Sequence, residues 1–239
     1  MASKNMVLAK LKKDLRGAGD SAKAKILKGF FKTGKGEYGE GDVFLGITVP
    51  KQRALVKKYW EQLTLGDLAK LLKSKIHEER LVALLVLVAK FKKAGENEKG
   101  NIFRFYLKHT QSINNWDLVD LSAPNIVGEF LLDKDRKALY ALAVSEDLWE
   151  RRIAILSTFA FIKRGESRDT LAIAKMLLND SHDLIHKAVG WMLRETGKRC
   201  GQKTLTDFLD RYTPQMPRTM LRYAIERLPE KLRKNYLKR

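Results

Sequence analysis

The heptapeptide NNWDLVD, residues 114–120, holds the side chains best suited to chemistry in this chain. It places Asp117 and Asp120 beside the indole of Trp116, although the chain carries a net charge of +19. A carboxylate can stabilise a developing positive charge or orient a water molecule, and the face of an indole attracts cations. The alternative is that Asp120 is a solvated residue near the end of a short helix that Pro124 interrupts. An acid near a helix C-terminus is mildly unfavourable, so the sequence favours a site role for Asp120.

The composition points to an anionic partner, because 47 Lys and Arg residues face only 28 Asp and Glu residues. The longest apolar run, residues 81–89, is too short to cross a bilayer. The N-terminus lacks the apolar core and cleavage site of a secretory signal. A single cysteine, Cys200, excludes an internal disulfide and a cysteine-based metal cage. We therefore expect an intracellular, cytoplasmic protein (associated with the nucleoid if bacterial), with no membrane contact, no metal and no cofactor.

Apolar residues recur at spacings of three and four in almost every segment, which predicts an all-α fold. Three similar segments carry a basic residue before an apolar pattern, at Arg80, Arg152 and Lys187, which are 72 and 35 residues apart. The first spacing spans two periods of 36 residues, which places a further member midway at Trp116. One more period of 35 residues after Lys187 leads to Arg222. A period near 35–40 residues with two helices per unit predicts an α-solenoid of HEAT-like antiparallel helix pairs. Chance spacing in any protein built from helical hairpins is the alternative.

We expect one HEAT-like repeat domain over residues 1–239. Within it, residues 1–48 form an N-terminal helical hairpin and a glycine-rich connector, and residues 49–239 form the stacked helix pairs. The segment 34–47 contains five glycines but does not match the phosphate-loop spacing GxxxxGK[ST]. It is therefore expected to be a flexible connector.

In a right-handed array of helix pairs, the second helices line a concave face. We call each member of the series position 0 of its register; the residue four positions later, +4, then lies on the same side of the helix. Position +4 is apolar at Leu84 and Leu156 but acidic at Asp120, which singles out Asp120. The predicted face is concave and basic, with two indoles and an acid near its centre. The ten positions are Arg80, Trp116, Arg152, Lys187 and Arg222 at register 0, and Leu84, Asp120, Leu156, Trp191 and Glu226 at +4.

Five segments in order carry a family resemblance. They are FLGITVPKQRALVKK (44–58), NWDLVD (115–120), WERRIAIL (149–156), KAVGWMLRE (187–195) and MPRTMLRYAIE (216–226). With these segments the chain resembles, over most of its length, the AlkD-type DNA alkylation repair glycosylases, which are built from HEAT-like repeats. In that family an aspartate and two tryptophans face the lesion, and an arginine helps to hold the DNA backbone.

The resemblance assigns roles to residues of this chain by motif. The WDxVD motif implies that Trp116 and Asp120 face the lesion, and the GWxLRE motif implies the same for Trp191. The RxAIL motif implies that Arg152 helps to hold the DNA backbone. Further phosphate contacts are expected from Lys187 and Arg222, with Arg194 and Arg80 as weaker candidates. One departure is Asn115, where the best-known member has a second tryptophan, and this bears on lesion preference.

The implied function is a monofunctional DNA-alkylpurine N-glycosylase that excises cationic N7- and N3-alkylated purines from duplex DNA. The resemblance also implies excision without flipping the base. We expect a monomer with no obligate protein partner. Relatives on the same scaffold bind branched DNA without base excision, so a non-catalytic binder of branched or damaged DNA is the main alternative. A protein-binding HEAT scaffold is the third possibility.

Overall fold

The computed structural model describes residues 2–238, with side chains from residue 6 onward. The chain divides into two compact units, Met1–Ser122 and Ala123–Arg239. The prediction of an all-α fold is confirmed, because the regular elements among the described residues are helices and the only β-pairing there is an isolated bridge between Val43 and Ile76. No helix in the described part of the chain has the length and apolar character needed to cross a membrane.

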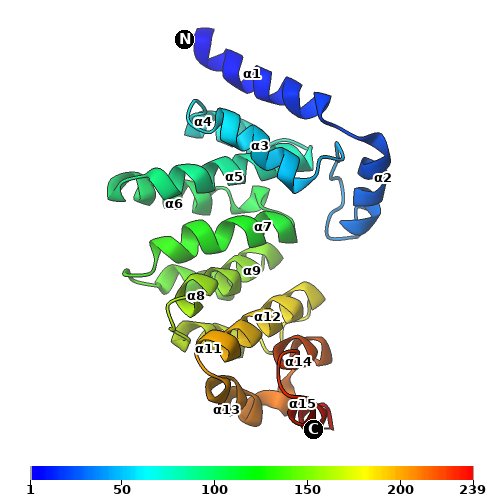
Figure 1. Ribbon diagram of the computed structural model, residues 1–239, viewed down its shortest axis with the longest axis vertical. Coiled ribbons are helices and arrows are strands. Elements are labelled where there is room, and N and C mark those ends of the chain that lie inside the picture. The colour runs from blue at the N-terminus through cyan, green and yellow to red at the C-terminus, as the bar shows by residue number, and fades with distance from the viewer. Residues whose placement is uncertain (1, 239) are drawn as a thin grey trace. The chain divides into compact units, whose positions relative to one another are not determined.

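The first unit is assembled around one buried helix (Figure 1). This helix, α5, carries the longest apolar run of the chain and packs against α1, α3, α4 and α6. A capping box between Thr64 and Asp67 begins α4, since each residue accepts a hydrogen bond from the backbone of the other. The helices of this unit are α1 (Ala2–Gly17), α2 (Ser21–Phe30), α3 (Val49–Tyr59), α4 (Leu65–Leu72), α5 (His77–Lys93), α6 (Glu96–Lys108), a short 3₁₀ turn (Thr110–Ser112) and α7 (Trp116–Ala123), whose last residue already belongs to the second unit.

The second unit is organised around α12, which packs against α9, α11, α13 and α14. Gly190 permits the close approach of α14, because a Cβ atom there would lie 2.5 Å from the carbonyl oxygen of Met220. The elements of this unit are a π-helical turn (Pro124–Gly128), α8 (Lys137–Ala143), α9 (Leu148–Ser157), α10 (Phe159–Ile162), α11 (Arg168–Met176), α12 (Asp183–Arg199), α13 (Gln202–Tyr212), a 3₁₀ turn (Thr213–Gln215), α14 (Arg218–Ile225) and α15 (Glu230–Lys238).

The five positions of the predicted repeat all fall on helices. They lie on α5, α7, α9, α12 and α14. Helices that follow one another in the chain pack together as pairs, such as α4 with α5, α8 with α9 and α12 with α13. This packing is consistent with a helical solenoid, whereas the concave basic face stays a prediction.

The expectation of a flexible connector is wrong for its second half. The backbone N–H groups of Leu45, Gly46 and Ile47 donate to the carboxylate of Glu78 at 2.8–3.2 Å. Val43 also pairs with the start of α5, since it accepts from the N–H of His77 at 2.9 Å. Because the carboxylate of Glu78 is buried, it must be supplied with hydrogen-bond donors, and these bonds fix residues 43–47 against α5.

Gly46 is required by this arrangement, so replacing it with alanine is expected to destabilise the first unit. Its φ of +84° is strained for any residue with a side chain, and a Cβ atom would lie 2.0 Å from the carbonyl oxygen of Asp20. Gly36→Ala is the matched control, because Gly36 has a φ of +77° but no atom close to where a Cβ atom would stand. Denaturant unfolding should show that the control lowers the free energy of unfolding by about 1 kcal/mol, because Gly36→Ala introduces backbone strain without a steric clash. A loss for Gly46→Ala no larger than that of Gly36→Ala would contradict the close packing at Gly46.

Candidate active site

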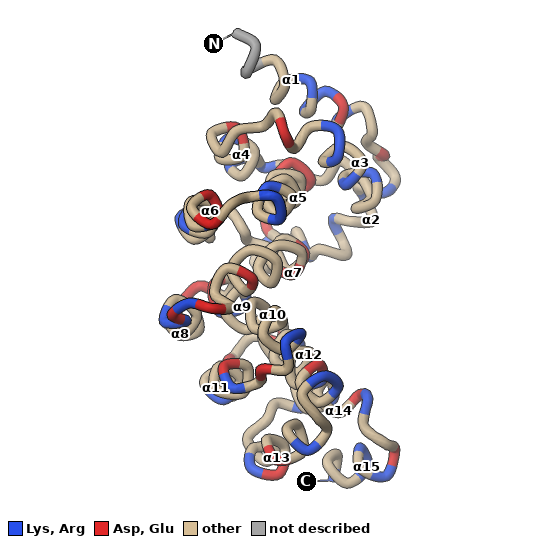
Figure 2. The backbone as a smooth tube through the Cα atoms, turned by 60° about the vertical axis from the view of Figure 1, so that its left-hand side comes forward, with Lys and Arg blue, Asp and Glu red and all other residues tan. Residues whose placement is uncertain are grey.

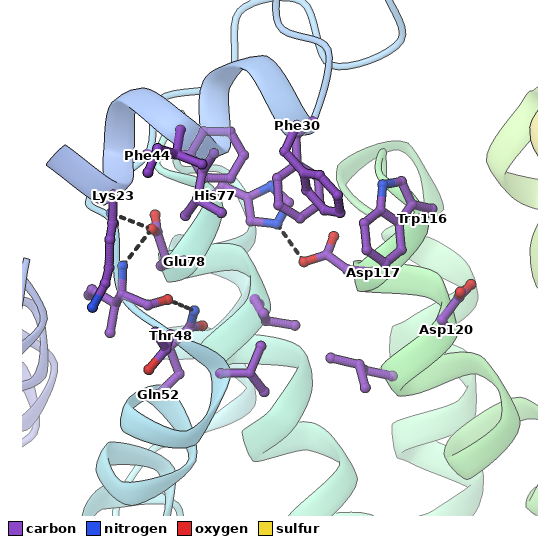
Figure 3. A pocket seen from close by; sticks show the side chains of 18 residues that line it. Lys23, Phe30, Phe44, Thr48, Gln52, His77, Glu78, Trp116, Asp117 and Asp120 are labelled. Atoms are coloured by element: carbon purple, nitrogen blue, oxygen red, sulfur yellow. Dashed lines mark hydrogen bonds and ion pairs between the residues drawn. The ribbon is translucent and has the colours of Figure 1, made fainter. Parts of the chain in front are cut away.

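A cavity of about 370 Å³ lies in the first unit between α2, the start of α3, α5 and α7 (Figure 3). Trp116 and Asp120 both line it, so α7 brings these two predicted residues to one site. Most of the remaining wall is apolar. It includes Ile26, Leu27 and Phe30 of α2, Phe31 directly after α2, Phe44 of the connector, Leu81 of α5 and Leu121 of α7.

Aromatic rings hold Trp116 in place. The Phe31 ring stacks on the indole, with centroids 5.1 Å apart and planes inclined by 15°. Phe30 meets the same indole edge-on at 5.8 Å, and Phe44 stacks on Phe31 at 5.0 Å. Aromatic pairs in these geometries are each worth about 0.5–1.5 kcal/mol beyond the area they bury. The indole is therefore oriented by rings from the N-terminal part of the chain, which sequence reasoning did not assign to the site.

The first turn of α7 is held by two polar side chains. Asn115 is fully buried, and its Oδ1 accepts a hydrogen bond from the backbone N–H of Trp116 at 2.8 Å. Asp117 accepts from the N–H of Leu118 at 2.8 Å, and its charge lies at the positive end of the helix. Asn115 is thus part of the local structure that begins the helix bearing Trp116 and Asp120.

A buried charged cluster adjoins the cavity, and two of its members, His77 and Asp117, line the cavity wall. His77, only 2% exposed, has its Nδ1 3.0 Å from Asp42 and its Nε2 2.8 Å from Asp117. In Figure 3 the carboxylate of Asp117 points to the ring of His77. Arg80 donates from Nη2 to both oxygens of Asp42, at 2.7 and 2.8 Å. The cluster joins the connector, α5 and α7.

The pKa values in this cluster shift as expected for paired charges. Burial lowers the pKa of His77, but the hydrogen bonds with Asp117 and Asp42 outweigh burial and hold it above the ordinary value. Burial raises the pKa of Asp42, but its hydrogen bond with His77 and the charge of Arg80 outweigh this and keep it below the ordinary value. Both shifts favour the charged forms.

The phosphate role expected for Arg80 does not fit its surroundings. Its side chain is 4% exposed, forks onto Asp42 and donates from Nη1 to the carbonyl oxygen of Ser74 at 2.9 Å. A guanidinium so enclosed offers no face to a DNA backbone. Arg80 instead neutralises a buried carboxylate. Its burial argues against the DNA contact predicted from the repeat register, because a basic residue in the series need not be exposed.

The other predicted residues belong to the second unit. Lys187, Trp191 and Arg194 lie on one face of α12, at spacings of four and three residues. Arg222 is exposed on α14. Figure 2 shows Lys and Arg residues on both helices. Trp191 is half-buried, with its ring 6.3 Å from that of Phe159.

Acidic residues neighbour two of these cations. The Nζ of Lys187 lies 2.7 Å from Asp183, one turn earlier on α12. Arg194 forms an ion pair with Glu226 of α14. Ion pairs with a solvent-exposed partner contribute little to stability.

Arg152 is largely covered. It is 5% exposed, and its Nη1 donates to the carbonyl oxygen of Leu184 at 2.6 Å. This bond ties α9 to the start of α12, next to Lys187. The backbone contact that the resemblance implies for Arg152 would need exposed surface that this side chain largely lacks, so its placement supports a structural role.

Among the residues that the structure describes, no group of three His, Cys, Asp or Glu side chains could hold a metal ion. Two histidines one turn apart, His182 and His186, form hydrogen bonds at the start of α12. His182 caps the helix by accepting from the N–H of Leu184 at 3.1 Å, and His186 bonds to the carbonyl oxygen of Asp180.

Comparison with known proteins places this chain in a family. The chain is similar over 89% of its length to a solved structure described as a predicted DNA alkylation repair enzyme from Enterococcus faecalis, of which it covers 97%, with a TM-score of 0.68 and 16% sequence identity. At that identity the likeness shows the fold alone. No curated protein matches the chain. A family model of DNA alkylation repair enzymes matches residues 11–228, and the chain therefore belongs to the family of DNA alkylation repair enzymes.

Proposed function

We propose that this protein is a DNA glycosylase that hydrolyses the N-glycosidic bond of N7- and N3-alkylated purines in duplex DNA. The observation that carries the proposal is that Asp120 and Trp116 line one aromatic-walled cavity. Family membership supports a role in alkylation repair. A cavity of this kind, largely apolar with a few polar groups, is typical of a site that binds a small organic group.

The proposed chemistry needs one carboxylate. A purine alkylated at N7 or N3 is cationic, so it departs as a neutral base and needs no proton from the enzyme. The positive charge then develops on the sugar, where the carboxylate of Asp120 would stabilise it and orient the attacking water. The paired carboxylates of glycoside hydrolases are unnecessary for a leaving group that is already activated.

Trp116 would contribute through the face of its indole. Contacts between a cation and an aromatic face are worth about 0.5–2 kcal/mol, more when water is excluded. Phe31 covers one face of the indole at 5.1 Å, so the ring is held in one orientation before any lesion binds. Such preorganisation lowers the cost of binding.

We propose that the second unit contacts DNA through α12 and α14. Trp191 would face the substrate, while Lys187, Arg194 and Arg222 would bind phosphates. Phosphate contacts position a protein on DNA without reading its sequence, and they make affinity depend on salt. A repair enzyme that meets lesions in any sequence context requires this kind of binding.

Arg222→Ala is expected to weaken binding to duplex DNA by a similar factor for all sequences. Arg222 is exposed on α14, and the loss of one phosphate contact should reduce the slope of log affinity against log salt by about 1. Fluorescence anisotropy at several salt concentrations measures this slope. Arg211→Ala, at an exposed position on α13, is the matched control. Equal slopes for the two variants would remove Arg222 from the DNA-binding surface.

The glycosylase proposal is tested by incubating the protein with a duplex that contains 7-methylguanine. The expected products are the free base, detected by chromatography, and an abasic site in the intact strand, detected by cleavage with alkali. Bound DNA without either product would reject the proposal and favour a non-catalytic binder of branched or damaged DNA. Absence of salt-dependent DNA binding would favour a protein-binding scaffold.

A further inference from the structure

We propose that His77, held as an imidazolium between Asp42 and Asp117, is a positioning residue that fixes Trp116 and Asp120 at the cavity. Its effect on base release rests on the proposed glycosylase function. Its effect on the position of Trp116 does not. The two consequences are therefore tested by different measurements.

The hydrogen-bond geometry sets the charge of the ring. Nδ1 lies 3.0 Å from a carboxylate oxygen of Asp42, and Nε2 lies 2.8 Å from one of Asp117. An ionised carboxylate only accepts hydrogen bonds, so both ring nitrogens must donate, and only the imidazolium carries a proton on each. A neutral ring would direct one lone pair at a carboxylate oxygen.

Charge balance leads to the same state. Asp42, Asp117 and Arg80 are buried with His77, so a neutral ring would leave one uncompensated negative charge. The carboxylate of Glu78, the next residue of α5, is occupied by three backbone N–H groups. The other charged groups at the cavity are Lys23 of α2 and Asp120 of α7. The imidazolium therefore makes the buried cluster neutral.

Two paths connect this ring to Trp116. The first runs through hydrogen bonds, because Asp117 accepts from His77 and is the neighbour of Trp116 in the first turn of α7. The second runs through stacked rings, because Phe31 lies 4.9 Å from the ring of His77 and 5.1 Å from that of Trp116. Phe44 covers the imidazole as well, at 4.6 Å. Asp120 follows one turn along the same helix.

The direction of the pH effect follows from the raised pKa of His77. The stabilisation that protonated His77 provides is complete below its ordinary pKa of about 6.5 and is lost as pH rises through its raised value. The pKa of Asp42 is lowered, so the stabilisation that its ionised carboxylate provides is lost only as the pH falls through that lowered pKa. Trp116 and Asp120 should therefore be held less firmly once the pH has risen through the raised pKa of His77.

The decisive experiment is an NMR titration of the whole chain that follows the ring nitrogens of His77 and the indole N–H of Trp116. The expected result is two protonated ring nitrogens near neutral pH and a Trp116 shift with the same midpoint as the loss of the His77 proton. A neutral His77 near pH 7, or a Trp116 signal that does not change as His77 titrates, would overturn the proposal even if no base were released.

Variants separate positioning from folding. His77→Gln alone leaves a buried charge unpaired, so the test uses the double variant His77→Gln with Asp117→Asn, which keeps the cluster neutral. We expect it to fold and to bind DNA like the wild type, to show no Trp116 titration, and to release base more slowly, by up to about 100-fold. His109→Gln is the control, because His109 directly follows α6 and its Nδ1 donates to the carbonyl oxygen of Phe105 at 2.8 Å, away from the cluster. A Trp116 titration that persists in the double variant would refute the role of His77.

Discussion

Replacing Asp120 with asparagine is expected to slow the release of an alkylated purine about 100-fold, by analogy with the removal of one electrostatic stabiliser from an active site. Asparagine keeps the shape of the side chain at the cavity but removes the charge that would face the developing sugar cation. Single-turnover measurements on a duplex containing 7-methylguanine give the rate of the chemical step without product release. This substitution has the largest expected effect on activity.

The matched control is Asp207→Asn, which removes one negative charge from an exposed position on α13. Both variants raise the net charge equally, so any general gain in DNA affinity is common to them. We expect the control to release base at the wild-type rate. Equal rates for Asp120→Asn and Asp207→Asn would show that Asp120 is only a solvated helix residue.

Arg80→Met is expected to lower the free energy of unfolding by about 3–5 kcal/mol, the usual cost of removing one partner of a buried ion pair. Methionine fills part of the same space, but Asp42 would lose two hydrogen bonds and its neutralising charge. Urea or guanidinium unfolding, followed by circular dichroism, measures the change. This is the largest effect on stability that we expect from one substitution.

Arg53→Met is the control, because Arg53 is exposed on α3 in the same unit. Its expected loss is within about 0.5 kcal/mol of zero, as for most surface substitutions. If Arg80 bound phosphate instead, Arg80→Met would weaken DNA binding with little change in stability. That outcome would contradict the placement of Arg80 in the buried cluster.

The helical fold could be predicted from the sequence because apolar spacing records which face of each helix is buried. The same pattern identified Asp120, since an acid stands where Leu84 and Leu156 occupy the equivalent position. Trp116 and Asp120 are four residues apart on one helix, so their shared location follows from helical geometry alone. Residues related by local geometry are therefore the part of the site that a single sequence shows.

The buried cluster could not be predicted in this way. His77 lies 35 residues from Asp42 and 40 from Asp117, and no local periodicity relates positions so far apart. Polar residues such as those in HEER (77–80) look like a solvated helix start. Only the packing of the connector onto α5 shows that they are enclosed.

The basic residues of the series show the same limit. The repeat placed Arg80, Arg152 and Arg222 at equivalent positions, yet the first two are buried and the third is exposed. Arg80 donates hydrogen bonds to the carboxylate of Asp42 in the connector, and Arg152 donates one to the carbonyl oxygen of Leu184. Equivalent positions in a repeat share a place on the helix, while their exposure depends on neighbours that differ from one repeat to the next.

The most direct test of the proposed glycosylase chemistry is to measure base release and DNA binding in the same samples of wild type and Asp120→Asn. We predict that both bind a methylated duplex, that the wild type releases free 7-methylguanine, and that the variant releases it about 100-fold more slowly. Binding by both proteins without release by either would contradict this chemistry, and would identify a protein that recognises DNA without excising bases.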